Sequence, residues 1–235
     1  MTERRFIHGF HAIIAKLRHS PDDISEIFID RQRQDARARD LVKLAEVHGV
    51  RLIQADAARI DGMAGGNACH QGVVAQVSGV QRILKLDDVL DTLDGPALLL
   101  VLDGVQDPHN LGACLRVADA AGAHAVIAPK DRACGLNATA IKVASGAAES
   151  VPYITVTNLA RTLRELQERN IMTLGAAGEA ETDLYSIDQR SSRLTRENCD
   201  QLARIPMLGS VESLNVSVAS GICLFEARRQ RSIKK

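Results

Sequence analysis

Two polar stretches of this sequence carry the side chains best suited to chemistry. The first follows an apolar run and places Asn110, Gly112 and Arg116 in an expected helix over 110–121. The guanidinium of Arg116 could grip a phosphate or a ribose in bidentate fashion, although a surface ion pair would also explain an Arg there. Gly112 costs the helix about 1 kcal/mol relative to Ala, which indicates close approach of a backbone or a ligand. Asn110 alone is typical of an ordinary N-cap.

The second stretch is "IPMLGSVESLNVSVASG", at 205–221. Small polar residues occupy the start of an apolar helix expected over 213–231, and they are Ser213, Asn215, Ser217 and Ser220. One interpretation is a Ser-rich helix N-terminus with its cap. The alternative is a bound ligand or a close partner, because several small polar groups expose hydrogen-bonding atoms in one place.

Composition and motifs exclude several other classes of protein. The sequence contains no GxGxxG, P-loop, nucleophile elbow or HExxH pattern, which argues against dinucleotide, P-loop, hydrolase and zincin chemistry. The five cysteines lack metal-site spacing, so we expect no metal and no disulfide framework; they are Cys69, Cys114, Cys134, Cys199 and Cys223. Aromatic residues make up only 3% and the net charge is zero, so neither base stacking nor a strongly basic surface is indicated. With no signal peptide or membrane span apparent, we expect a cytoplasmic protein.

The first third of the chain predicts a small α/β domain over 1–78. Its expected helices and strands alternate, and they are a helix over 10–20, a strand over 25–30, a helix over 35–49 ending at Gly49, a strand over 50–56, a short helix over 56–66 and a strand over 70–78. The polar segment 79–96 ends in Gly-Pro and is the expected inter-domain linker, with room for a short helix.

The remainder, 97–235, predicts an α/β domain built on a parallel sheet. Expected strands over 97–103, 123–129, 151–156 and 171–177 alternate with helices over 110–121, 136–148, 158–170 and 213–231. Asn158 is the expected N-cap of the third of these helices. Because ligands bind outside the carboxyl ends of parallel strands, the turns that carry Asn110 and Ser213 should gather along one edge.

The motif "DPHNLGACLRVADAAGAHAVIAPKDR" and the segment "IPMLGSVESLNVSVASGICLFEA" resemble the SpoU/TrmH-type RNA ribose methyltransferases. The small first domain, with its "HQG" at 70–72, is similar to that family's substrate-binding domain. The resemblance implies a SPOUT fold, a parallel sheet with a C-terminal trefoil knot, working as a homodimer with the last helix in its interface. It implies S-adenosylmethionine as cofactor and 2′-O-methylation of a guanosine ribose in large-subunit (23S) ribosomal RNA.

The same resemblance assigns site residues by position. Asn110 would orient Arg116 or the ribose, Arg116 would position the ribose or a phosphate, and Ser213 and Asn215 would lie in the reacting pocket. The implied cofactor contacts are Ile205, Met207, Gly209 and Leu214. In the first domain, the Arg-rich stretch 31–40 is a possible phosphate-contacting face, although a solvated helix face would explain it equally. Its arginines are Arg31, Arg33, Arg37 and Arg39.

One part of the family pattern is missing. A second motif, an apolar strand followed by a Gly-x-Glu-x-x-Gly turn, should precede "RLTRENCD", but only "SIDQRSSR" lies between Tyr185 and Leu194. Either the printed sequence omits a stretch of the natural chain, or the chain lacks that strand. The second case predicts an RNA-binding relative that has lost catalysis.

Overall fold

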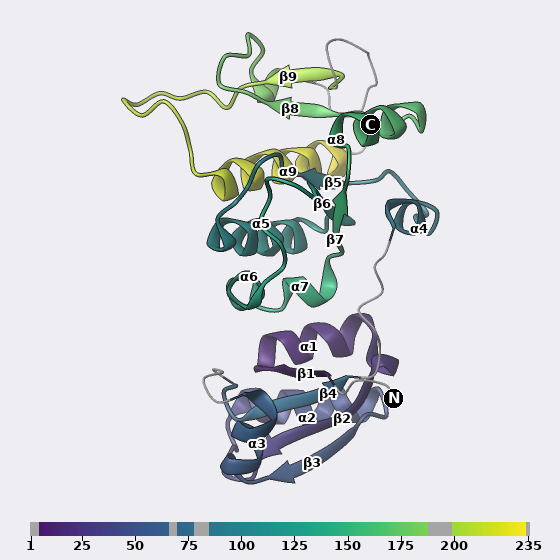
Figure 1. The fold of residues 1–235 in the computed structure, drawn as a ribbon, viewed down its shortest axis with the longest axis vertical. Helices are drawn as coiled ribbons and strands as arrows, with labels where there is room; N and C mark the ends of the chain where they lie inside the picture. The colour runs from purple at the N-terminus through teal and green to yellow at the C-terminus, as the bar shows by residue number, and fades with distance from the viewer. Residues whose placement is uncertain (1–4, 66–69, 78–84, 188–198, 234–235) are drawn as a thin grey trace. The chain divides into compact units, whose positions relative to one another are not determined.

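The computed structural model describes residues 5–65, 70–77, 85–187 and 199–233. The chain forms two compact units, which we describe separately (Figure 1). The first comprises Met1–Ile83 and the short segment Ser145–Ser150; the second comprises Leu84–Ala144 and Val151–Lys235. Of the expected linker 79–96, residues 79–84 lie outside the described chain, and the remainder contains the short helix α4 (Leu86–Leu90).

A four-stranded mixed sheet forms the first unit, in the order β1-β4-β2-β3. The β2–β3 pair is parallel, and the β1–β4 and β2–β4 pairs are antiparallel. The strands are β1 (Arg5–His8), β2 (Ile24–Asp30), β3 (Arg51–Ala55) and β4 (Val73–Val77). The helical segments are α1 (Phe10–His19), η1 (Pro21–Asp23), α2 (Ala36–Val47), α3 (Ala57–Ala64) and α7 (Ala147–Ser150). The sequence did not predict β1.

Successive side chains of β2 point to opposite faces of this sheet, and both faces are buried. Ile27 and Ile29 belong to one apolar cluster with Leu41 of α2, whereas Phe28 belongs to another with Ile60 of α3. Both helices begin at an Asp whose carboxylate accepts a backbone N–H of the first turn. Gly49 follows α2 with φ +67°, as its C-terminal position predicts.

The described residues of the second unit form two separate parallel sheets. One has the order β5-β6-β7 and the other pairs β8 with β9. The strands are β5 (Leu99–Val101), β6 (Ala125–Pro129), β7 (Tyr153–Val156), β8 (Leu174–Ala176) and β9 (Gln201–Ala203). The remaining helical segments are α5 (Pro108–Ala121), α6 (Ala138–Ala144), α8 (Leu159–Glu168), η2 (Leu184–Ser186) and α9 (Val216–Ser232). In Figure 1, α9 lies between α5 and the β8–β9 pair.

Apart from the ends of helices, such as α9 beginning at Val216 and not at 213, two expectations for this part of the chain were wrong. The single helix expected over 136–148 is interrupted, because Ser145 and Gly146 have φ +52° and +96°, and α7 begins after them. The strand expected over 171–177 forms β8, but β8 pairs with β9 and does not join β5–β7 among the described residues. The N-cap expected at Asn158 is confirmed, since its side chain accepts the N–H of Arg161.

Candidate functional site

Helix α5 begins two residues earlier than the sequence predicted, and Asp107, not Asn110, is its N-cap. The Asp107 carboxylate accepts the backbone N–H groups of His109 and Asn110, each at 3.2 Å. Pro108 fills the first helical position, where its missing N–H is harmless. The Asp-Pro pair was the sequence signal for this start. Asn110 is therefore free to use its side chain elsewhere.

The structure brings Asn110 and Asn215 together. Asn215 donates from Nδ2 to Oδ1 of Asn110 at 2.9 Å, across 105 positions of sequence. Asn215 is itself the N-cap of α9, where its Oδ1 accepts both the backbone N–H of Ser217 at 2.9 Å and the Ser217 hydroxyl at 2.7 Å. The N-termini of α5 and α9 thus meet through side-chain amides. Two helix N-termini in one place favour an anionic or oxygen-rich ligand.

Gly112 is explained by packing between helices. A Cβ at this position would stand 2.6 Å from both the carbonyl oxygen of Ala140 and the Cβ of Val143, so α6 approaches α5 at its backbone. Deeper in the unit, Ser220 of α9 lies with its Oγ 3.9 Å from Sγ of Cys114. Burial raises the pKa of the Cys114 thiol. Of the alternatives that the sequence left open for Gly112, close backbone approach is therefore the correct one, and Ser220 serves helix packing.

Arg116 and Ser213 are exposed, and among the described residues the side chain of Asn110 is hydrogen-bonded to Asn215 and to neither of them. Residues six positions apart do not share a face of an α-helix, so the side chains of Arg116 and Asn110 leave α5 on different sides. Within the described chain Arg116 forms no ion pair, so the structure gives no support to the surface ion-pair interpretation. A guanidinium held by no carboxylate remains available to an anion.

The predicted cofactor contacts lie on the segment between β9 and α9, which projects away from both sheets in Figure 1. Ile205 and Met207 are half-buried, and Ile205 packs on the apolar cluster around Leu184. Gly209 is exposed, with open space where a Cβ would stand. Of the four, Leu214 alone lines a cavity in the second unit.

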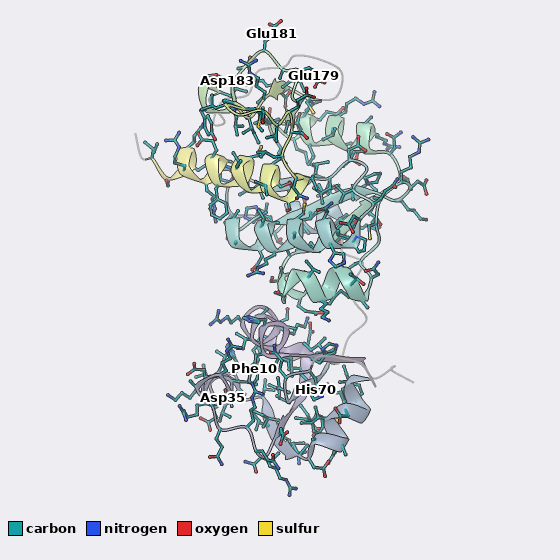
Figure 2. The ribbon with its side chains drawn as sticks, turned by 90° about the vertical axis from the view of Figure 1, so that its left-hand side faces the viewer. Phe10, Asp35, His70, Glu179, Glu181 and Asp183 are labelled. Carbon is teal, nitrogen blue, oxygen red and sulfur yellow. The ribbon has the colours of Figure 1, made fainter. Side chains whose placement is uncertain are left out.

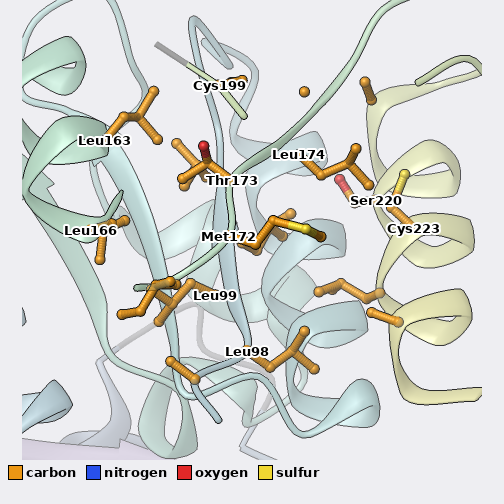
Figure 3. Close-up of a pocket in the computed structure, with 18 of the residues that line it drawn as sticks. Leu98, Leu99, Leu163, Leu166, Met172, Thr173, Leu174, Cys199, Ser220 and Cys223 are labelled. Carbon is orange, nitrogen blue, oxygen red and sulfur yellow. The ribbon is translucent and has the colours of Figure 1, made fainter. Parts of the chain in front are cut away.

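That cavity has a volume of about 1230 Å³ and lies between β5, α8, β8 and α9. Figure 3 shows Leu99, Leu166, Met172 and Cys223 among the side chains around it. Its walls are largely apolar, and a well-packed interior rarely leaves even a water-sized void.

The segment between Tyr185 and Leu194, where the family's second motif is missing from the sequence, falls mainly on residues 188–198, which lie outside the described chain. The cavity separates the two parallel sheets that the sequence predicted as one.

The Arg-rich stretch of the first unit is only partly free. Arg31, Arg37 and Arg39 are exposed, and Arg39 donates to the carbonyl of Gln34. Arg33 lies 2.6 Å from the Asp35 carboxylate, and its guanidinium carbon stands 5.3 Å from the ring centre of Phe10; Figure 2 labels Phe10 and Asp35.

Hydrogen bonding to Ala38, and less strongly the charge of Arg33, lower the pKa of Asp35, so the carboxylate stays charged beside the arginine. Arg33 is accordingly held in place, and the other three arginines are freer.

Metal and membrane features are missing from the described residues. Among them, no group of three or more His, Cys, Asp and Glu side chains is placed to hold a metal ion. Figure 2 shows Glu179, Glu181 and Asp183 at one end of the second unit, where Asp183 pairs with Arg204 at 2.7 Å. The four described cysteines are free. In the described part of the chain, no helix is long and apolar enough to cross a membrane.

Comparison with known proteins covers both units. The SpoU rRNA Methylase family model matches residues 97–225, and the model for RNA 2′-O ribose methyltransferase substrate binding matches residues 6–82. The 23S rRNA (guanosine-2′-O-)-methyltransferase RlmB of Ralstonia nicotianae is 60% identical over 246 residues, covering 99% of this chain and 98% of the relative. The RlmB of Escherichia coli is 53% identical over 241 residues, covering 96% and 98%.

Solved structures agree on the fold. A crystal structure of an RNA 2′-O ribose methyltransferase matches with a TM-score of 0.69 at 24% identity, over 99% of this chain and 90% of that one. The SpoU methyltransferase AviRb from Streptomyces viridochromogenes, in complex with AdoMet, matches with a TM-score of 0.67 at 23% identity, over 99% and 92%. With both of its units matched and a relative 60% identical along almost its whole length, this chain belongs to the SpoU rRNA methylase family.

Proposed function

We propose that this chain transfers a methyl group from S-adenosylmethionine to the 2′-oxygen of a guanosine ribose in 23S ribosomal RNA. The observation that carries the proposal is similarity along the whole chain, at 51–60% identity, to relatives named for that reaction. The pairing of Asn110 with Asn215, within the matched methylase domain, supplies a polar site that such a reaction can use. Because the substrate is ribosomal RNA, the protein would act in the cytoplasm.

The reaction needs a ribose hydroxyl aligned with a methyl carbon. When bound, S-adenosylmethionine would supply a methyl group on a positively charged sulfur and would leave as the neutral thioether S-adenosylhomocysteine, with the ribose hydroxyl proton passing to water. The chain's own residues hold the RNA for this step, since alignment accounts for much of such a rate. Asn110, Asn215 and Ser213 present neutral polar groups to the ribose. Arg116 contributes a guanidinium whose paired N–H groups can hold a phosphate or the ribose.

The segment between β9 and α9 fits the cofactor in its chemistry. Ile205, Met207 and Leu214 offer half-buried apolar side chains that suit an adenine ring, and Gly209 leaves its surroundings open. Backbone groups along this non-helical segment are available to bind polar atoms. These four residues would hold S-adenosylmethionine in a C-terminal trefoil knot.

RNA and a second copy of the chain are the proposed partners. The first unit, matched to a substrate-binding model, would grip phosphates through Arg31, Arg33, Arg37 and Arg39. Helix α9 exposes Val218 and Phe225, which lie seven residues apart and so on one side of the helix. An exposed apolar stripe on a long helix supports a homodimer with α9 in its interface.

We propose that the cavity between β5 and β8 is the place of a strand missing from the printed sequence. Strand β5 is an edge of its sheet among the described residues, and half-buried Leu99 and Val101 face unfilled space. The alignment with the Ralstonia relative runs over 246 residues, more than the 235 of this chain, so the relative carries residues that this sequence lacks. The names of these relatives give no support to the non-catalytic alternative.

Calorimetric titration of the purified chain with S-adenosylmethionine, after its intact mass has been measured, tests this proposal. We expect binding in the micromolar range and its loss in Leu214→Asp. The matched control is Leu208→Asp on the same segment, where the side chain is 98% exposed, and it should bind normally. If a chain of the printed mass failed to bind at millimolar cofactor, the non-catalytic alternative would replace the proposal.

A further inference from the structure

The orientation of the Asn215 side-chain amide is determined by Ser217. Oδ1 of Asn215 accepts two hydrogen bonds from this one residue, from the backbone N–H at 2.9 Å and the hydroxyl at 2.7 Å. An amide carries its oxygen and its NH2 group on opposite sides. With the oxygen turned toward Ser217, Nδ2 of Asn215 points toward Asn110 and donates to its Oδ1 at 2.9 Å.

The hydrogen bond from Asn215 orients the side-chain amide of Asn110 in the same way. Its oxygen is occupied by Asn215, so its own NH2 group is directed away from that contact. Among the described residues, Nδ2 of Asn110 has no hydrogen-bond partner, although the residue is half-buried at the first turn of α5. A partly buried donor without an acceptor favours binding of a ligand that brings one.

We infer that Ser217 is a positioning residue which, through Asn215, turns Asn110 into a hydrogen-bond donor toward an RNA oxygen. The acceptor is a ribose or a phosphate oxygen, since both are abundant on RNA and accept from an amide. This inference rests on the proposed function for its ligand, but the chain Ser217–Asn215–Asn110 is a property of the free protein. It assigns Asn110 a donor role, which its residue type alone leaves undecided.

Substitutions at Asn110 separate donor from acceptor. Asn110→Asp keeps an oxygen for Nδ2 of Asn215 but removes the NH2 group, so it should lose as much kcat/KM as Asn110→Ala. If Asn110→Asp kept wild-type kcat/KM, the donor role would be wrong. RNA with a 2′-deoxy target nucleotide identifies the acceptor. The affinity difference between wild type and Asn110→Ala disappears with this RNA if the acceptor is the 2′-oxygen and persists if it is a phosphate.

Substitutions at Ser217 test the relay itself. Ser217→Ala should lower kcat/KM by about 3- to 10-fold, the value of one neutral hydrogen bond, and Ser217→Thr should restore it. In an Asn110→Ala background, Ser217→Ala should cause no further loss. The matched control is Ser232→Ala at the far end of α9, where the hydroxyl donates to the Arg229 carbonyl. Equal losses from Ser217→Ala with and without Asn110 would overturn the inference.

An NMR measurement on the free protein keeps this test independent of catalysis. The side-chain NH2 signals of Asn215 should shift in Ser217→Ala and return in Ser217→Thr, with neither RNA nor cofactor present. Unchanged Asn215 signals would refute the relay even if the enzyme were active. Conversely, shifted signals in a protein that methylates no RNA would uphold the relay and contradict the proposed function.

Discussion

Gly112 of α5 is a position where helix propensity and packing make opposite demands. Changing it to Ala would favour the helix by about 1 kcal/mol. The new Cβ would stand 2.6 Å from the Ala140 carbonyl oxygen and 2.6 Å from Cβ of Val143, closer than such contacts normally occur. Overpacking of this kind costs about 1–3 kcal/mol, and a backbone carbonyl of α6 cannot rotate out of the way as a side chain can.

Taking the upper half of that range and subtracting the gain in helix propensity, we expect Gly112→Ala to lower the free energy of unfolding by about 1–2 kcal/mol. Thermal unfolding followed by circular dichroism should show a Tm lower by about 2–8 °C. Gly62 in α3 is the matched control, because nothing lies within 4 Å of its added Cβ, so Gly62→Ala should be stabilising by about 0.5–1 kcal/mol. If Gly112→Ala raised the Tm as Gly62→Ala does, the close approach of α5 and α6 would be refuted.

Three further predictions concern individual side chains. Gln71 has φ +54°, so Gln71→Gly should stabilise the first unit by about 1 kcal/mol in urea unfolding, and a lower midpoint would count against this. Hydrogen bonding to Arg229 lowers the pKa of Glu226 from 4.5 to about 2. The charged Glu226 carboxylate therefore contributes fully to folding stability above about pH 4.5, and this contribution is lost as the pH falls toward 2. Glu226→Gln should make Tm fall less steeply across that pH range, and an unchanged slope would contradict the prediction. Burial raises the pKa of Tyr153 to about 12, and its hydroxyl donates to the Cys134 carbonyl. Tyr153→Phe should remove only the most alkaline step of an ultraviolet titration, whereas loss of an earlier step would contradict this.

The helices were largely predictable because caps and apolar spacing agree with the packing. Asn158 and Gly49 mark helix ends in the sequence and in the structure. The start of α5 was misplaced because Asn110 and Asp107 are both good caps, and only the backbone shows that Pro108 is already helical. The break at Ser145 depends on positive φ values at residues that also occur within helices.

The sequence predicted the approximate location of the site, but not its hydrogen bonds or the pairing of β8. The rule that turns gather at the ends of parallel strands anticipates that the starts of α5 and α9 lie close together. It does not give the hydrogen bond between Asn110 and Asn215, because residue spacing carries no information on contacts across 105 positions. The division into two sheets was missed for a related reason. Periodicity identifies β8 as a strand but not its neighbour; in the structure β8 pairs with β9, and a cavity lies between β8 and β5.

The most direct test of the central claim is methyl transfer by the mass-verified chain itself. Purified protein would be incubated with S-adenosylmethionine and 23S ribosomal RNA from cells that lack this modification, and the digested RNA would be analysed by nucleoside mass spectrometry. We expect 2′-O-methylguanosine to appear at one site, with little in Asn110→Ala. Absence of any methylated nucleoside, from protein that still binds the RNA, would contradict the proposed function and favour a non-catalytic RNA-binding role.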